Sequence, residues 1–200
     1  MRFGPKSKNV ISILGLCFSL VACSGLGGKE LTTYDLSAPE DFSSVRGRSS
    51  AQILVPVPSA LKSLDSEMIV VRPSGSEITY FGDAQWSDRL PRVIQEKLIQ
   101  SFENSNLVRS VAKPGEGVVV DYKISATIRQ FDLIDQGSGQ AKAILAVKII
   151  NDRNGRVRAS RTFIATQPAN LSSAETGVIA LDKAADQILL EIVAWVVKVI

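Results

Sequence analysis

Residues 118–134 read VVVDYKISATIRQFDLI, and the alternation within this stretch decides the fold class. Up to Ile128 the even-numbered positions are apolar or aromatic, and most of the odd-numbered positions are polar. A period of two indicates a strand with one buried face and one solvated face. The next apolar residues, Phe131 and Leu133, have odd numbers, which predicts a β-bulge near Gln130.

Two further strands are predicted directly after this one. Residues 141–150 are apolar on both faces, which is typical of a central strand, and residues 156–165 form the third strand. Glycine-containing turns at 136–139 and 151–155 connect the three segments. Because the connections are so short, we expect an antiparallel meander.

Shorter strands are predicted upstream of the meander. Residues 68–72 and 77–81 flank the turn sequence Pro-Ser-Gly-Ser, which is typical of a hairpin. Three more segments have strand-like composition, namely residues 31–36, 52–57 and 107–111.

Two helices are predicted by apolar residues at helical spacing. In residues 90–102 they recur every four positions, and Ser87 or Asp88 is the expected N-cap. The second helix fills residues 172–200 and starts with a Ser-x-x-Glu capping box at Ser172. Together these elements predict an α+β fold. We expect a two-layer sandwich, with a mainly antiparallel sheet of five to seven strands and both amphipathic helices on one face.

The N-terminus has the pattern of an export signal. Arg2, Lys6 and Lys8 precede an apolar run over residues 10–22, and no acidic residue occurs before Glu30. This run is too short to cross a bilayer core of roughly 30 Å as a permanent helix. The sequence therefore predicts that residues 1–22 are a cleaved signal peptide.

The cleavage site resembles the lipobox of bacterial lipoproteins. It reads Leu-Val-Ala-Cys and ends at Cys23, whose thiol would be acylated before cleavage. Ser24 follows, and in Gram-negative bacteria a residue other than aspartate there favours transfer to the outer membrane, facing the periplasm. We expect residues 23–30 to be a lipid-anchored tether and residues 31–200 to be the domain. An ordinary signal peptide with an incidental cysteine is the alternative.

Charge and composition exclude several classes of function. The predicted signal removes three of the 23 basic residues and none of the 20 acidic ones, so the mature chain is neutral and is not expected to bind nucleic acid. The sequence has no histidine, and its other cysteine, Cys17, lies inside the signal. We therefore expect no metal, no cofactor and no enzymatic activity. Asp132 and Asp135 are interpreted as residues that flank a turn, not as paired catalytic carboxylates.

The last turns of the chain allow two interpretations. Residues 192–200 are almost all apolar and include Trp195. Such a segment either packs over the sheet, or meets a partner or the membrane surface.

The order of these elements resembles the ABC-type transport auxiliary lipoprotein family, which includes paraquat-inducible protein C-like lipoproteins. The resemblance covers almost all of the mature chain, although no single motif is specific. It rests on four stretches, which are Thr33–Pro39, Tyr80-Phe81 followed by Trp86 and Leu90, Asp121–Ile124 followed by Ile128 and Phe131, and Ala194–Val196. One departure is Ser87, where family members often have alanine after the tryptophan.

The resemblance implies a non-catalytic role in lipid transport between the inner and outer membranes. The implied partners are an MCE-domain periplasmic protein and, through it, a permease and an ATPase. Tyr80, Trp86 and Trp195 are the candidates for a packing or partner surface, and exposed strand edges would allow self-association.

Two other classes of function stay open at the level of sequence. An outer-membrane assembly lipoprotein, such as a plug or chaperone for lipopolysaccharide export, would also pair a sheet with two helices. A periplasmic hydrolase would need a buried serine or carboxylate constellation, and the sequence shows none.

Overall fold

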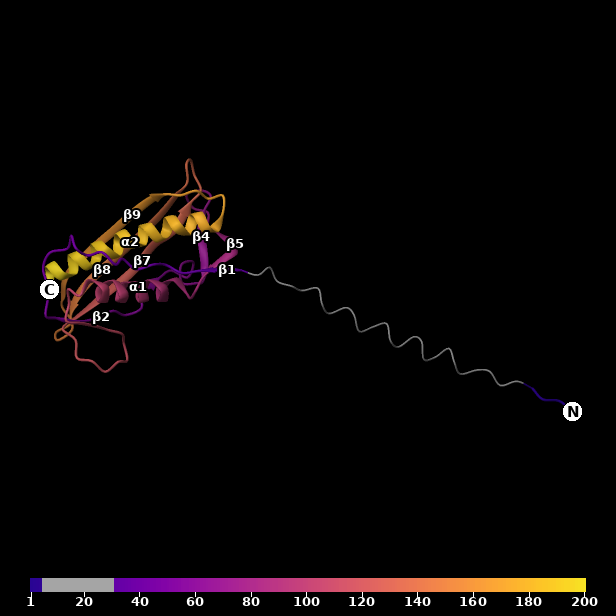
Figure 1. Ribbon diagram of the computed structural model, residues 1–200, viewed down its shortest axis with the longest axis horizontal. Helices are drawn as coiled ribbons and strands as arrows, with labels where there is room; N and C mark the ends of the chain where they lie inside the picture. The colour runs from indigo at the N-terminus through magenta and orange to yellow at the C-terminus, as the bar shows by residue number, and fades with distance from the viewer. Residues whose placement is uncertain (5–30) are drawn as a thin grey trace. The chain divides into compact units, whose positions relative to one another are not determined.

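The computed structural model describes residues 1–4 and 31–200, and every structural statement below concerns those residues. The predicted tether and Cys23, and all but the first four residues of the predicted signal, lie outside them. Residues 31–200 form one compact unit with an α+β fold, in which two helices pack on a nine-stranded sheet (Figure 1). The predicted fold class is confirmed.

The meander is the longest part of the sheet. It consists of β7 (Tyr122–Ile134), β8 (Gln140–Asn151) and β9 (Val157–Pro168), paired antiparallel. The register of β7 against β8 shifts between Ile128 and Gln130, which confirms the predicted bulge. Burial moves accordingly from even to odd positions along β7.

The start of β7 differs from the prediction. The strand begins at Tyr122, and Val118 and Val119 are 46% and 84% exposed in the preceding loop. Their alternation fits a strand, but within the described residues β8 ends at Asn151, opposite Tyr122, and offers no partner beyond that point. Pairing therefore ends the strand where the sequence pattern would continue it.

Short strands raise the count above the five to seven expected. The hairpin is β4 (Met68–Arg72) with β5 (Thr79–Trp86), and β4 also lies parallel to the end of β7. Four strands of two or three residues pair in parallel with their neighbours, namely β1 (Thr32–Tyr34), β2 (Gln52–Leu54), β3 (Ser59–Ala60) and β6 (Ser110–Ala112). The long pairings within the meander remain antiparallel.

Both helices lie on the same face of the sheet, as predicted (Figure 1). Helix α1 (Leu90–Ser105) follows Arg89, which makes no capping side-chain bond, so neither Ser87 nor Asp88 is the N-cap. Helix α2 (Ala174–Val199) is capped by Ser173. No helix in the described residues combines the length and apolar character of a membrane span.

The cap of α2 lies one residue later than predicted. The Ser173 side chain accepts a hydrogen bond from the Thr176 backbone N–H at 3.3 Å. The Ser172 backbone N–H instead donates to the Asn170 side chain at 2.9 Å, which holds Ser172 in the preceding turn. The predicted capping box of Ser172 with Glu175 is therefore wrong, although the type of cap is the same.

The turn between β7 and β8 offers a test of the fold. Gly139 has φ +73°, and a Cβ added there would lie 2.5 Å from the backbone oxygen of Ala169. We expect Gly139→Ala to lower the free energy of unfolding by about 2–4 kcal/mol, because left-handed strain and the backbone clash add together. Gly137→Ala is the matched control, since Gly137 has φ +64° but open space around it, and should cost only about 1 kcal/mol. Equal costs in urea unfolding would contradict the described turn.

Candidate functional site

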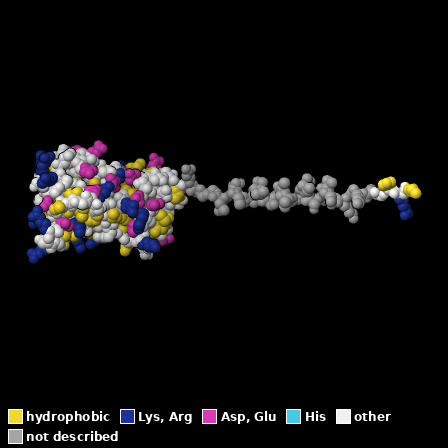
Figure 2. Space-filling view, turned by 90° about the horizontal axis from the view of Figure 1, so that it is seen from below, with side chains coloured by type: hydrophobic (Ala, Val, Ile, Leu, Met, Phe, Trp, Pro, Cys, Tyr) yellow, Lys and Arg dark blue, Asp and Glu magenta, His cyan; other side chains and the backbone are white. Residues whose placement is uncertain are grey.

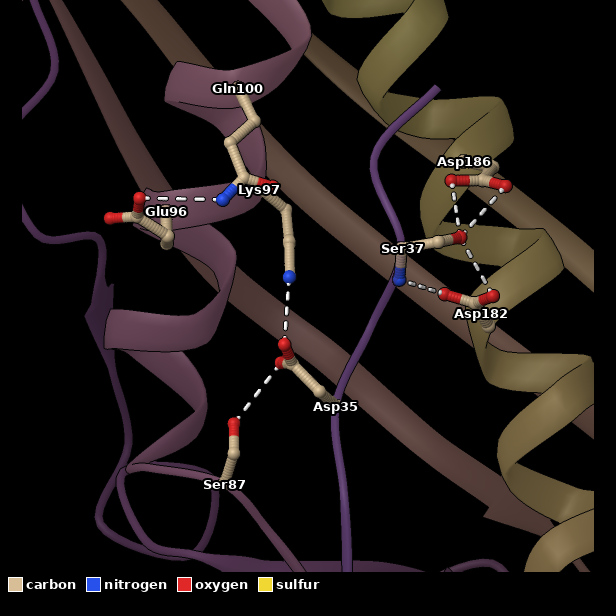
Figure 3. Close-up of polar contacts among 8 residues, drawn as sticks. All are labelled: Asp35, Ser37, Ser87, Glu96, Lys97, Gln100, Asp182 and Asp186. Atoms are coloured by element: carbon tan, nitrogen blue, oxygen red, sulfur yellow. Dashed lines mark hydrogen bonds and ion pairs between the residues drawn. The ribbon is translucent and has the colours of Figure 1, made fainter. Parts of the chain in front are cut away.

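The chain after β1 crosses the molecule between the two helices. We call residues 35–47 the crossing segment; Figure 3 shows part of it passing between α1 and α2. It contacts both helices, because the Asn104 side chain of α1 donates to the Pro39 carbonyl oxygen at 3.0 Å, and Gly47 lies against Val197 of α2. Phe42, within the segment, is buried.

An ion pair fixes the start of the crossing segment to α1. The Lys97 Nζ lies 2.8 Å from Asp35 Oδ2, and Ser87 Oγ donates to Asp35 Oδ1 at 3.1 Å (Figure 3). The two partners differ in exposure, since the Lys97 side chain is 11% exposed and that of Asp35 is 53% exposed. The helical pattern of the sequence places Lys97 on the polar side of α1, and the crossing segment covers that position.

Ser37 fixes the segment to α2. Its backbone N–H donates to Asp182 Oδ1 at 2.7 Å, and its hydroxyl lies 2.8 Å from Asp182 Oδ2. Both carboxylate oxygens of Asp186 lie 3.3 Å from the same hydroxyl (Figure 3). Asp182 and Asp186 are four residues apart and so share one side of the helix, where one serine faces two carboxylates.

The two attachments shift carboxyl pKa values in opposite directions. Burial alone would raise the pKa of Asp35, but hydrogen bonds from Lys97, the Leu36 backbone and Ser87, with the Lys97 charge, lower it below its ordinary value. Burial raises the pKa of Asp186, and the neighbouring Asp182 charge raises it further against the opposing Ser37 hydrogen bond.

A second ion pair on α1 continues this polar surface. Lys113 Nζ lies 2.6 Å from Glu96 Oε2, and Gln100 Nε2 donates to Glu96 Oε1 at 3.4 Å. The hydrogen bond from Lys113 lowers the pKa of Glu96. A shallow polar pocket of about 360 Å³ lies beside these groups, with Asp35, Ser87 and Lys97 in its wall. The charged groups at this pocket serve as one another's partners, and they fix the crossing segment to α1.

The three predicted surface residues lie in different environments. Trp86 is 2% exposed and packs edge-on against Phe131, with ring centroids 5.9 Å apart, so it belongs to the core. Tyr80 is 36% exposed in β5, opposite Val70. Trp195 is half-buried near the end of α2. The structure does not bring them together into one surface.

Trp195 forms part of an aromatic and basic cluster that the sequence did not reveal. Its ring packs edge-on against Phe163 of β9 at 5.6 Å, and the guanidinium of Arg161 lies 4.8 Å from the Phe163 ring centroid. Arg158 Nε donates to the Val199 carbonyl oxygen at 2.9 Å, close to the end of α2. Figure 2 shows lysine and arginine side chains gathered at this end of the domain, at the left of the view.

The position of Asp132 differs from the one predicted from the sequence. It lies within β7 with no exposed surface, and it pairs with Arg72 of β4. Gln130 Nε2 donates to its other oxygen at 2.9 Å. Asp132 is therefore a structural group joining two strands and does not flank the turn as Asp135 does.

No group of three or more histidine, cysteine, aspartate or glutamate side chains in the described part of the chain could hold a metal ion. The residue with the most definite predicted chemistry, Cys23, lies outside that part. The functional argument therefore rests on the fold, the surfaces and the similarity to known proteins.

Residues 34–193 match the sequence profile of a family described as ABC-type transport auxiliary lipoprotein component. The chain belongs to this family. A crystal structure of a protein from Xanthomonas campestris is 27% identical, with a TM-score of 0.79, covering 84% of this chain and 95% of the other. A Chlamydia trachomatis hypothetical protein shares the fold at 10% identity and a TM-score of 0.52, covering 75% of this chain and 97% of its own.

A longer relative is known from Bradyrhizobium diazoefficiens. This uncharacterized protein is 28% identical over 192 residues, which are 96% of this chain and 52% of the relative. The chain thus spans about half the length of the curated relative that it matches.

Substitution of the two partners of the Asp35–Lys97 ion pair should change the free energy of unfolding by different amounts. Asp35→Asn would leave the Lys97 ammonium with little solvent and no anion, and should cost about 1–2 kcal/mol in the free energy of unfolding. Lys97→Met keeps the buried stem and leaves an exposed Asp35, so it should cost less than about 1 kcal/mol. Urea unfolding at pH 7 measures both, and an equal or reversed order would contradict the described burial.

The raised pKa of Asp186 predicts that its contribution to stability changes with pH in a definite direction. A carboxyl with a raised pKa holds its proton more tightly in the folded chain, so its contribution is complete below the ordinary pKa near 4 and is lost as the pH rises. Asp186→Asn should therefore raise the melting temperature by a few degrees at pH 7 and by almost nothing at pH 4. Asp135→Asn, at an exposed turn, is the control. Destabilisation of the Asp186 variant at pH 7 would overturn the interpretation.

Proposed function

We propose that the chain is a non-catalytic, lipid-anchored subunit of an MCE-type ABC transport system that moves lipids between the inner and outer membranes. The observation that carries the proposal is the family match, which extends over nearly the whole described domain. In this proposal an MCE-domain periplasmic protein is the direct partner, and the permease and ATPase are bound through it.

The sequence supports an outer-membrane location facing the periplasm. Cys23 would carry the lipid, and Ser24 lacks the acidic side chain that favours retention at the inner membrane. Several acyl chains on one residue exceed what stable anchoring requires. The residues from Ser24 to Glu30 span at most roughly 25 Å when extended, so the domain would stay close to its membrane.

The polar groups of the domain support a role without catalysis. Asp35 is paired with Lys97, Asp182 is bonded to Ser37, and the buried carboxylate of Asp132 is paired with Arg72. An enzyme would need a positioned nucleophile or base that is free to reach a substrate. A subunit that acts through its surfaces needs only a stable fold and an anchor.

Co-purification from cross-linked cells tests the proposal. A C-terminally tagged chain should recover the MCE-domain protein, the permease and the ATPase of one transport system. Cys23→Ser should abolish incorporation of labelled palmitate and reduce this recovery by about tenfold, because the domain would no longer be held at the membrane. Cys17→Ser is the matched control, since that residue would leave with the signal.

Two outcomes would contradict the proposal. Consistent recovery of a lipopolysaccharide-export barrel, with no MCE-domain protein, would favour an assembly lipoprotein instead. Undiminished palmitate labelling of the Cys23→Ser chain would show that the lipid is attached elsewhere.

A further inference from the structure

Strand β9 forms an open edge of the sheet. Among the described residues it pairs with β8 alone, from Gln140 with Pro168 to Ile150 with Val157, and the register shifts between Ile149 and Ile150. It contains 12 residues and lies at the margin of the sheet beside α2 (Figure 1). Proteins normally cover, shorten or twist such an edge, because its outer backbone donors and acceptors can pair with another chain.

A groove runs beside this edge between β9 and α2. Its volume is about 540 Å³, and Leu190, Ala194 and Trp195 of α2 form its apolar wall. Arg161 of β9 and Glu191, Lys198 and Val199 of α2 also line it. A helix alongside an open strand, with an apolar wall between them, has the geometry by which protein domains bind extended peptides as an added strand.

The charge around the groove is mainly positive. Arg161 and Lys198 line the groove and are exposed, and the exposed Arg158 donates to the carbonyl oxygen of Val199 in the same lining. Strand β9 contains no acidic residue. The one acid in the lining, Glu191, lies 3.9 Å from Arg161 and is thus partly neutralised. An occupant that complements this rim must carry acidic side chains.

A second copy of the chain does not satisfy these conditions. If two β9 edges paired antiparallel, Arg158 and Arg161 of both copies would share one interface, and no acid of β9 would compensate for their charge. A membrane surface would match the charge, but lipid headgroups present no regular row of backbone groups to the strand.

We propose that the β9 edge and the adjacent groove bind an extended acidic segment of a partner protein, which adds a strand to the sheet. The side chains on one face of that segment would point toward α2, where apolar ones would meet Trp195 and Leu190 and acidic ones would meet Arg158, Arg161 and Lys198. None of the residues that line the groove belongs to the crossing segment.

The probe is a synthetic peptide of about ten residues in which the positions of one face are glutamate and valine in turn and the intervening positions are serine. The full-length lipoprotein, purified in non-ionic detergent, should bind it in a fluorescence anisotropy assay. Binding should weaken as the salt concentration rises, and the amide groups of β9 should gain protection from hydrogen exchange. A peptide with lysine in place of each glutamate should not bind.

Charge reversal locates the binding surface. Arg161→Glu with Lys198→Glu should weaken binding of the acidic peptide about tenfold or more. Lys62→Glu with Arg92→Glu makes the same change in charge on exposed residues away from β9 and should leave binding unchanged. Urea unfolding of each variant establishes that the fold is retained.

Three results would overturn the inference. They are equal binding of both peptides, equal losses in the two double variants, and peptide binding without protection of β9 amides. Stronger binding of the Trp195 surface to anionic phosphatidylglycerol vesicles than to the peptide would assign the surface to a membrane instead. Because the probe is synthetic, these outcomes do not depend on which transport system the chain serves.

Discussion

The contact between α2 and the meander is the interaction on which the rest of the structure depends. Leu181, Ile188 and Ile192 of α2 are at most 1% exposed, and they cover the face of the sheet that carries the apolar residues of β7, β8 and β9. Burial of apolar side chains at about 25 cal/mol per Å² is the main favourable contribution in such a layer. Close approach at Gly177, where an added Cβ would lie 2.6 Å from a Leu133 methyl carbon, sets the position of the helix over the strands.

The packing of α2 on the sheet also determines where the crossing segment lies. The helix α2 lies along the β9 side with α1 beside it, and the crossing segment passes between the two helices. Polar residues hold the segment in place from both sides, through Lys97 on α1 and the two aspartates on α2. In the proposed lipoprotein, only β1, which pairs with β5, separates this segment from the tether. A force applied through the tether would therefore act first on β1 and then on contacts that join both helices.

Much of this fold could be predicted from the sequence, because β7 obeys a strict period of two and the helices obey a period near 3.6. The bulge at Gln130 followed from the same pattern. The pairing of the shortest strands could not be predicted, since the partners of β2 are β6 and β7 and the partner of β3 is β7, all far along the chain. The cap of α2 was misplaced because Ser172 and Ser173 are adjacent and equally suited to the role.

The polar contacts that hold the crossing segment could not be predicted from sequence patterns, for a different reason. Asp35 and Lys97 are separated by 62 positions, and Ser37 and Asp182 by 145. No local periodicity relates residues so far apart. Asp132 was misread because its neighbour Asp135 does belong to the turn, whereas its own partner, Arg72, comes from another strand. The apolar character of Trp195 was evident, but its basic neighbours on β9 became visible only with the strand in place.

We propose that the domain assists an ABC transporter through its surfaces and performs no chemistry itself. The most direct measurement is ATP-dependent transfer of labelled phospholipid from proteoliposomes that contain the MCE-type transporter to vesicles that carry the lipoprotein. We expect faster transfer of the phospholipid with the lipoprotein than without it, and no transfer when the transporter is absent. The lipid should be chemically unchanged. Cleavage or modification of the lipid by the lipoprotein alone would contradict it.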